Sequence, residues 1–131
     1  KKYFNVIPRE QLIGSEPGQK WTVPSVCLVS ESNYSDAHLF PVAYKELGLG
    51  DAVGMPVAGT GTAVWWERLM DASLVFGIPE VGIQTPDGKY LENNQFEPDY
   101  KVVNEYNIVT KNRDQQIEKS VDLLLRKIGL R

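Results

Sequence analysis

The residues best suited to chemistry in this sequence are a serine and an aspartate, Ser35 and Asp36, at a point where a strand should lead into a helix. The apolar run Ser25–Val29 is typical of a buried strand, and apolar residues recur at helical spacing from Leu39 to Leu47. A helix start offers unpaired backbone N–H groups and a positive dipole end, and both stabilise an oxyanion beside a serine oxygen. This pattern suits acyl transfer. Because Ser and Asp are also common helix caps, the local pattern leaves a purely capping role open.

A glutamate further along the chain, Glu92, is a candidate carboxylate for the same chemistry. The Asp-Gly pair at positions 87 and 88 has the composition of a tight hairpin turn, so Lys89–Asn93 should run back beside the preceding strand. Alternation along that strand could point Glu92 toward Ser35. A lone glutamate on a hairpin is more often simply solvated, so spacing alone leaves that alternative open.

The single histidine, His38, follows Ser35 by three positions. Residues three apart share one face of a helix, and a serine nucleophile needs a base, so a contact between the two is sterically possible. A productive base must reach the hydroxyl from the substrate side and be oriented by a third group. A side chain directed along its own helix rarely does this, so His38 is interpreted as a polar residue at a helix start, near a partner surface.

Three segments, in order, resemble parts of one enzyme family. Pro24–Gly61 resembles the nucleophile region of the tail-specific, or C-terminal processing, serine peptidases, and particularly of their tricorn-like branch: a strand, a Ser-Asp pair, a Phe-Pro helix and a short strand ending in a Gly-rich loop. Gly88–Val102 resembles the glutamate-bearing segment of that branch, and Asn112–Leu125 is similar to its closing helix. The resemblance implies an α/β domain with the ClpP/crotonase-like spiral ββα fold.

The resemblance also implies roles for individual residues. Ser35 matches the nucleophile, and Asp36 matches the residue whose N–H joins the oxyanion hole and whose side chain lies near the specificity pocket. Glu92 matches the carboxylate of a serine-histidine-serine-glutamate tetrad. The other branch of the family uses a lysine from the loop after the short strand, but Met55–Thr62 contains no lysine, which favours the tetrad.

In the family the catalytic histidine and the second serine lie far upstream of the nucleophile, whereas thirty-four residues precede Ser35 here. Residues 25–131 are therefore expected to be the C-terminal part of a peptidase domain, with 1–24 as a connecting segment. The expected partners are a peptide or protein substrate and the missing N-terminal part of the same protein, and the isolated chain should be nearly inert. The resemblance favours an extracytoplasmic, periplasmic location and leaves a cytoplasmic one open.

Composition excludes several function classes. The 131 residues are 42% hydrophobic, which suits one compact unit. A net charge of −3 with dispersed lysines and arginines argues against a nucleic-acid partner, and no apolar run approaches the roughly 20 residues of a membrane span. Cys27 stands alone in an apolar run, so no disulfide or zinc site is expected, and neither a metal nor another cofactor is predicted.

The middle of the chain should form short strands, at Thr62–Glu67, Leu74–Ile78 and Val81–Thr85. Trp65 and Trp66 are adjacent and face opposite sides of a strand, so one of them is expected in the core. The other could wall a substrate groove or meet the missing half. Open sheet edges could also let the chain associate with itself.

The remaining elements follow from periodicity and end signals. A helix is expected over about Ala37–Leu47 and a strand over Ala52–Val57. The closing helix should begin with a capping-box-like pair, Asn112 and Gln115, and end at Gly129. Its apolar stripe is expected to close the core and consists of Ile117, Val121, Leu124, Leu125 and Ile128.

Two other classes of function compete with a peptidase. A noncatalytic peptide-binding or assembly module could keep the same motifs after losing activity. An acyl-CoA hydratase of the crotonase type is disfavoured because its chemistry does not call for Ser-Asp at a helix start. The Gly-rich stretch at 55–62 lacks the spacing of a phosphate-binding loop, which argues against a nucleotide site.

Overall fold

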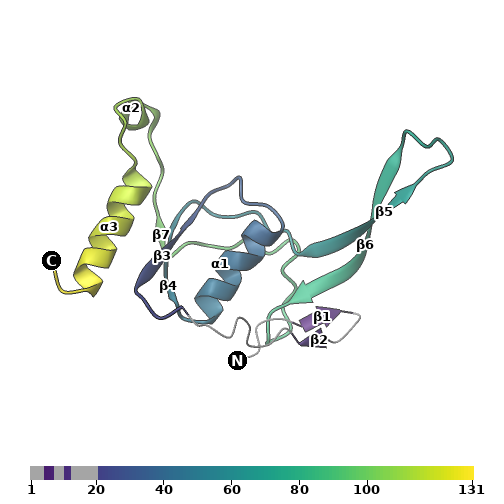
Figure 1. Cartoon of the computed structure of the whole chain (residues 1–131), viewed down its shortest axis with the longest axis horizontal. Coiled ribbons are helices and arrows are strands. Elements are labelled where there is room, and N and C mark those ends of the chain that lie inside the picture. The colour runs from purple at the N-terminus through teal and green to yellow at the C-terminus, as the bar shows by residue number, and fades with distance from the viewer. Residues whose placement is uncertain (1–4, 8–10, 13–20) are drawn as a thin grey trace.

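The described part of the chain forms two β-sheets, and helices α1 and α3 pack beside one of them (Figure 1). The computed structural model describes residues 5–7, 11–12 and 21–131. A parallel sheet, in the order β3-β4-β7, lies in the body, and an antiparallel sheet, in the order β2-β1-β6-β5, extends from it. This mixed organisation confirms the predicted α/β class. The elements are β1 (Asn5–Ile7), β2 (Gln11–Leu12), β3 (Ser25–Val29), α1 (Asp36–Glu46), β4 (Gly50–Gly54), β5 (Thr62–Arg68), β6 (Val75–Gln84), β7 (Tyr100–Lys101), α2 (Tyr106–Val109) and α3 (Gln115–Lys127).

The parallel sheet is built on the predicted strand Ser25–Val29, which is confirmed as β3. β3 pairs with β4 in register from Ser25 opposite Gly50 to Val29 opposite Gly54. At Gly54 a side chain is impossible, because a Cβ would lie 1.8 Å from the carbonyl oxygen of Val29. β4 ends there, earlier than the predicted Val57, and Val57 instead forms an isolated bridge with Phe96.

The helix after the serine, α1, begins and ends within one residue of the predicted Ala37–Leu47. Gly48 follows it with a φ of 65°, as a glycine after a helix end does. Pro41 lies inside α1 and cannot donate to the carbonyl of Ala37, four residues earlier. The Nδ2 of Asn33 donates to that carbonyl instead, at 3.0 Å, so the helix keeps a proline without leaving the oxygen unpaired.

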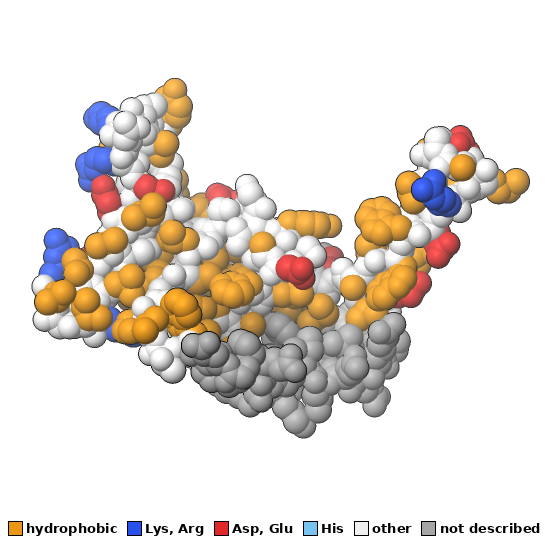
Figure 2. Space-filling model, in the orientation of Figure 1, with side chains coloured by type: hydrophobic (Ala, Val, Ile, Leu, Met, Phe, Trp, Pro, Cys, Tyr) orange, Lys and Arg blue, Asp and Glu red, His pale blue; other side chains and the backbone are white. Residues whose placement is uncertain are grey.

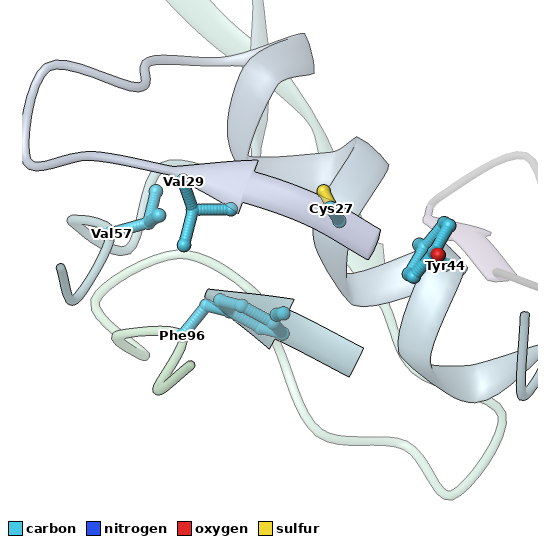
Figure 3. Packing of buried hydrophobic residues seen from close by; sticks show 6 residues of the cluster. Cys27, Val29, Tyr44, Val57 and Phe96 are labelled. Carbon is cyan, nitrogen blue, oxygen red and sulfur yellow. The ribbon is translucent and has the colours of Figure 1, made fainter. Parts of the chain in front are cut away.

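The hydrophobic core lies between α1, the parallel sheet and the segment around Phe96 (Figure 3). Tyr44 is the residue of α1 in the buried cluster, and its hydroxyl oxygen lies 2.7 Å from Ser25 Oγ. This part-buried hydrogen bond fixes the helix against the first residue of β3. The buried cluster consists of Cys27, Val29, Tyr44, Ala52, Val57 and Phe96.

An aspartate, Asp99, ties α1 to the edge of β4 immediately before β7 begins. Its carboxylate accepts from Lys45 Nζ at 2.6 Å and from the N–H of Ala52 at 2.9 Å. Burial would raise the pKa of Asp99, but the bonds from Lys45 and Ala52 to its charged form outweigh burial, and the pKa lies below its usual value. Asp99 therefore stabilises the body only while it is ionised.

The antiparallel sheet projects from the body as an arm formed by β5 and β6 (Figure 1). β5 confirms the predicted strand over Thr62–Glu67. The two strands predicted at Leu74–Ile78 and Val81–Thr85 are wrong as separate elements, because β6 runs unbroken through Pro79. The register skips Glu80, so Pro79, paired with Val64, lies directly beside a bulge, where a missing N–H is tolerated.

The arm exposes apolar side chains along its length, visible as orange atoms in Figure 2. Trp65 is 40% exposed and Trp66 70%. The expectation that one of them lies in the core is therefore wrong, because the arm leaves the body before this pair of residues. The segment expected to connect, residues 1–24, contributes β1 and β2 to this sheet, and the rest of it up to residue 20 lies outside the described residues.

The closing helix, α3, packs against β3 and β4 and ends at Lys127, and Gly129, shortly after it, has a φ of 77°. The predicted cap at Asn112 is wrong: Asp114 is the N-cap, and its carboxylate accepts from Ile117 N at 2.9 Å. The expectation that the whole apolar stripe closes the core is also wrong, because the sheet covers only part of the helix. Three members of the stripe are about half exposed: Ile117, Val121 and Ile128.

Candidate active site

Ser35 occupies a sharp corner between β3 and α1, with a φ of 55° and a ψ of −117°. A positive φ is uncommon for a residue with a side chain and marks a strained backbone. Asn33 braces the corner, since its Oδ1 accepts from the Ser30 N–H at 3.2 Å and its Nδ2 donates into the first turn of α1. Such strained strand-to-helix turns present a nucleophilic hydroxyl to solvent in other enzymes.

The backbone of Ser35 is held on both sides, while its hydroxyl is not used for capping. The carbonyl accepts from the N–H groups of His38 and Leu39 at 2.8 and 3.1 Å, and the Ser35 N–H donates to Thr60 Oγ1 at 2.8 Å. Ser35 is the N-cap residue of α1 by position, yet its side chain makes no capping hydrogen bond. The capping role that the sequence left open therefore does not account for this hydroxyl.

Asp36, the first residue of α1, offers a backbone donor beside that hydroxyl. The N–H of Ala37 donates to Tyr34, and the next two N–H groups donate to Ser35. The N–H of Asp36 has no partner within the described part of the chain. A free N–H at a helix start is the kind of donor that stabilises a developing oxyanion, and the exposed Asp36 carboxylate lies next to it.

Glu92 is half-buried, and donors from a distant loop hold it. Its Oε2 accepts from the Gly61 N–H at 2.8 Å and from Thr62 Oγ1 at 2.9 Å. The predicted turn at positions 87 and 88 is confirmed, with Gly88 at a φ of 87°. As predicted, the chain runs back beside β6 after this turn, with the Leu91 N–H donating to the carbonyl of Ile83 at 2.9 Å and Tyr90 paired with Gln84. The pairing stops short of the predicted Asn93, because the chain turns again after Leu91.

Ser35 and Glu92 line the same open cleft, which has a volume of about 360 Å³. The loop Thr60–Thr62 forms the part of the wall between them, since Thr60 binds the backbone of Ser35 and the next two residues bind Glu92. The arm supplies apolar wall at its base. The residues that line the cleft are Tyr34, Ser35, Thr60, Thr62, Val64, Pro79 and Glu92.

His38 lies outside the lining of this cleft. Its ring is fully buried, with Nδ1 2.8 Å from the carbonyl oxygen of Thr60 and 3.2 Å from the N–H of the same residue. Its Nε2 is buried with no partner among the described residues. The Nδ1 edge of the ring therefore contacts the loop. His38 is a polar residue in the first turn of α1, as interpreted, and its nearness to a partner surface stays a prediction.

Comparison with known proteins decides the family. The family description "Peptidase family S41" matches residues 3–102 of this chain. The chain belongs to peptidase family S41. This is the family of tail-specific serine peptidases that the motifs indicated. No curated protein matches the chain closely enough to be counted as a relative.

Solved structures share the fold of this S41 chain. A peptidase from Parabacteroides merdae described as putative in its own name superposes with a TM-score of 0.71 at 19% identity, over 88% of this chain and 36% of that one. Mature CPAF complexed with lactacystin superposes with a TM-score of 0.71 at 21% sequence identity, over 91% of this chain and 23% of that one. A photosystem II D1 C-terminal processing protease superposes with a TM-score of 0.62 at 18% sequence identity, over 77% of this chain and 27% of that one. The S41 chain thus spans about a third or less of each of these proteins.

The candidate site depends on residues that the motif comparison did not single out. Thr60, Gly61 and Thr62 hold Ser35 and Glu92, and the signal for them was the Gly-rich loop alone. Gly61 serves close approach rather than a turn, because a Cβ there would lie 2.5 Å from the Cβ of Leu91. A threonine flanked by small residues is a weak sequence signal, so its bond to the Ser35 N–H becomes visible only in three dimensions.

Three further observations concern a thiol nucleophile, a metal site and a membrane span. Burial raises the pKa of the Cys27 thiol, which disfavours the nucleophilic thiolate. Within the described residues, no group of three or more His, Cys, Asp and Glu side chains is arranged to hold a metal ion. None of the helices described is long and apolar enough to cross a membrane.

Proposed function

We propose that this chain carries the nucleophile of a serine endopeptidase of the tricorn-like branch, with Ser35 as nucleophile and Glu92 as the distal carboxylate. The observation that supports this most directly is that Ser35, whose hydroxyl makes no capping bond, shares one cleft with Glu92. Membership of family S41 supports the reaction class. The lack of lysine at 55–62, where Thr60 instead binds the Ser35 backbone, favours a tetrad over a lysine dyad.

In the proposed reaction Ser35 Oγ attacks the carbonyl carbon of the scissile peptide bond. The hydroxyl proton passes to a histidine that sequence outside this chain supplies, and the Asp36 N–H donates to the oxyanion. When the C–N bond breaks, the imidazolium returns that proton to the leaving amine, and the acyl group stays on Ser35. Water then releases the acyl group with the same histidine as base.

Glu92 acts through a second serine, also from outside this chain, to orient the histidine. Its Oε2 is fixed by two donors, from Gly61 and Thr62, whereas its Oε1 has no partner among the residues described. That free oxygen can accept from an incoming hydroxyl. Because the base is supplied from outside, the isolated chain should be slower than the complete site by about 10²- to 10⁴-fold, the usual contribution of a positioned base.

The proposed substrate is an extended peptide or a protein tail. Apolar side chains at the base of the arm, Val64 and Pro79, line the cleft beside Ser35 and suit an apolar stretch of chain. The exposed Asp36 carboxylate favours a basic side chain immediately before the cut. Peptides that differ only at that residue, lysine against glutamate, test this preference.

A fluorophosphonate probe tests the function, because it labels only an activated serine. The protein is expressed together with its upstream sequence, and the labelled residue is mapped by mass spectrometry. We expect label on Ser35, abolished in Ser35→Ala and retained in Ser32→Ala, an exposed serine of the same loop. If the chain is instead a noncatalytic peptide-binding or assembly module, peptide binds but Ser35 stays unlabelled, and the proposal fails.

A further inference from the structure

The only histidine of the chain is buried against the backbone of one loop residue, Thr60, although it does not line the cleft. The His38 side chain is 0% exposed, and its Nδ1 lies within hydrogen-bonding distance of both the N–H and the carbonyl oxygen of Thr60. Burying a polar ring is unfavourable unless hydrogen bonds compensate, and here the compensation comes from a single residue of a loop. The ring therefore fixes where that loop can lie.

The residue that His38 holds is the one that holds the proposed nucleophile. Thr60 Oγ1 accepts from the Ser35 N–H at 2.8 Å. Ser35 has a φ of 55°, and such a conformation persists only when the surroundings over-determine it. A hydrogen bond to the N–H of the strained residue is a direct way to do so, and His38 secures its acceptor.

The same loop orients the proposed carboxylate. Gly61 N–H and Thr62 Oγ1 both donate to Glu92 Oε2, so three consecutive residues fix the two groups that share the cleft. A shift of the loop away from α1 would move both groups together. The position of His38 under the loop thus couples the helix that carries Ser35 to the segment that carries Glu92.

We propose that His38 is a positioning residue of the Ser35 site: through its contact with the backbone of Thr60 it holds the loop that sets the backbone of Ser35 and the carboxylate of Glu92. This inference rests on the proposed function, because it assigns His38 to the same reaction without any contact with substrate. The ring acts through Nδ1 alone. Its Nε2 makes no hydrogen bond among the described residues.

Because only Nδ1 contacts Thr60, two substitutions of His38 can separate the loss of this contact from the loss of the ring. An asparagine side chain places its amide oxygen and nitrogen on Cγ, at the position of Nδ1, whereas a glutamine reaches the position of Nε2. His38→Asn should therefore preserve the contact with Thr60, and His38→Gln should lose it. Both are smaller than histidine, so cavity formation is common to the two and does not explain a difference between them.

The first measurement is amide hydrogen exchange of the whole chain by NMR, which reads the loop without any need for catalysis. In His38→Gln we expect the amides of Ser35 and Gly61 to exchange about tenfold faster, the order of effect of losing one hydrogen bond, with the β3–β4 ladder unchanged. His38→Asn should stay within about threefold of wild type. If the two variants behave alike, or if the ladder amides accelerate equally, His38 has only a structural role and the inference fails.

Variants at Thr60 keep the inference testable if the His38 variants do not fold. Thr60→Val preserves the shape of the side chain and removes the acceptor, and Thr60→Ser keeps the acceptor. We expect faster exchange at Ser35 in Thr60→Val alone, with Gly61 unchanged. Unchanged Ser35 exchange in Thr60→Val would overturn the link between the loop and the nucleophile.

The second measurement is phosphonate labelling of Ser35 in the protein with its upstream sequence. His38→Gln should label about tenfold more slowly, and His38→Asn should recover most of the wild-type rate. Normal labelling of His38→Gln would overturn the positioning role. No label on wild-type Ser35 would overturn the proposed function instead. The exchange data test the His38 contact separately, because amide exchange does not depend on enzyme activity.

Discussion

Replacing Ser35 by glycine should make the protein more stable than replacing it by alanine. Ser35 has a φ of 55° and a ψ of −117°, where a Cβ is unfavourable. Holding a non-glycine residue in such a region costs about 1–3 kcal/mol, and the Ala variant keeps that cost because it keeps the Cβ. The extra freedom of glycine in the unfolded chain offsets about 0.5–1 kcal/mol of the gain. Taking the middle of both ranges, Ser35→Gly should therefore exceed Ser35→Ala by roughly 1 kcal/mol in free energy of unfolding.

Urea unfolding of both variants measures this difference, and thermal unfolding should show a midpoint about 2–8 °C higher for Ser35→Gly in a chain of this size. A matched control is Ser32, which lies in the same loop and is not among the residues with a positive φ. There glycine should be the less stable of the two substitutions. If glycine at position 35 is no more stable than alanine, the backbone at the corner is not strained and the reasoning about Ser35 is refuted.

Three further predictions follow from the packing and the charges. Gly61→Ala should lower the free energy of unfolding by about 1–3 kcal/mol, because its Cβ would lie 2.5 Å from the Cβ of Leu91; an unchanged urea midpoint would contradict the close approach of the loop. Asp99→Asn should cost about 1–2 kcal/mol at pH 7. The pKa of Asp99 is lower in the folded protein, so wild type is more stable than Asp99→Asn above about pH 4 and loses this extra stability as the pH falls further. Urea unfolding in which the stability difference between the two proteins grows as the pH falls would contradict this prediction. Trp66→Lys should weaken concentration-dependent self-association through the open edge of β5, and equilibrium sedimentation that finds only monomer for wild type would remove the idea of self-association.

Features set by short stretches of sequence could be predicted, and the strand-to-helix corner is the clearest case. The apolar run of β3, the Ser-Asp pair and the helical spacing of α1 are local, and each lies within one residue of its predicted place. A motif indicates Glu92 as a candidate, but the strand predicted to carry it ends before Asn93, which adopts a turn conformation with a φ of 59°. Local patterns thus indicate which residues matter better than they indicate how each residue is held.

Features set by distant contacts could not be predicted from the sequence. The loop that binds Glu92 is some 30 residues away along the chain, and the burial of His38 depends on that loop rather than on helix periodicity. Periodicity also marks an apolar face without saying what covers it. The pattern predicts a core position for one of Trp65 and Trp66 and for the stripe of α3, whereas the arm leaves both tryptophans exposed and the sheet covers only part of α3.

The measurement that tests the central claim most directly is the rate of phosphonate labelling at Ser35 in Glu92→Gln, compared with wild type, in the protein with its upstream sequence. Glutamine preserves the shape of the side chain but removes the negative charge that orients the base. We predict label on Ser35 in wild type and labelling slowed by about tenfold or more in the variant. Equal rates in the two proteins, or label on a different serine, would contradict the claim that Ser35 and Glu92 act together in one cleft.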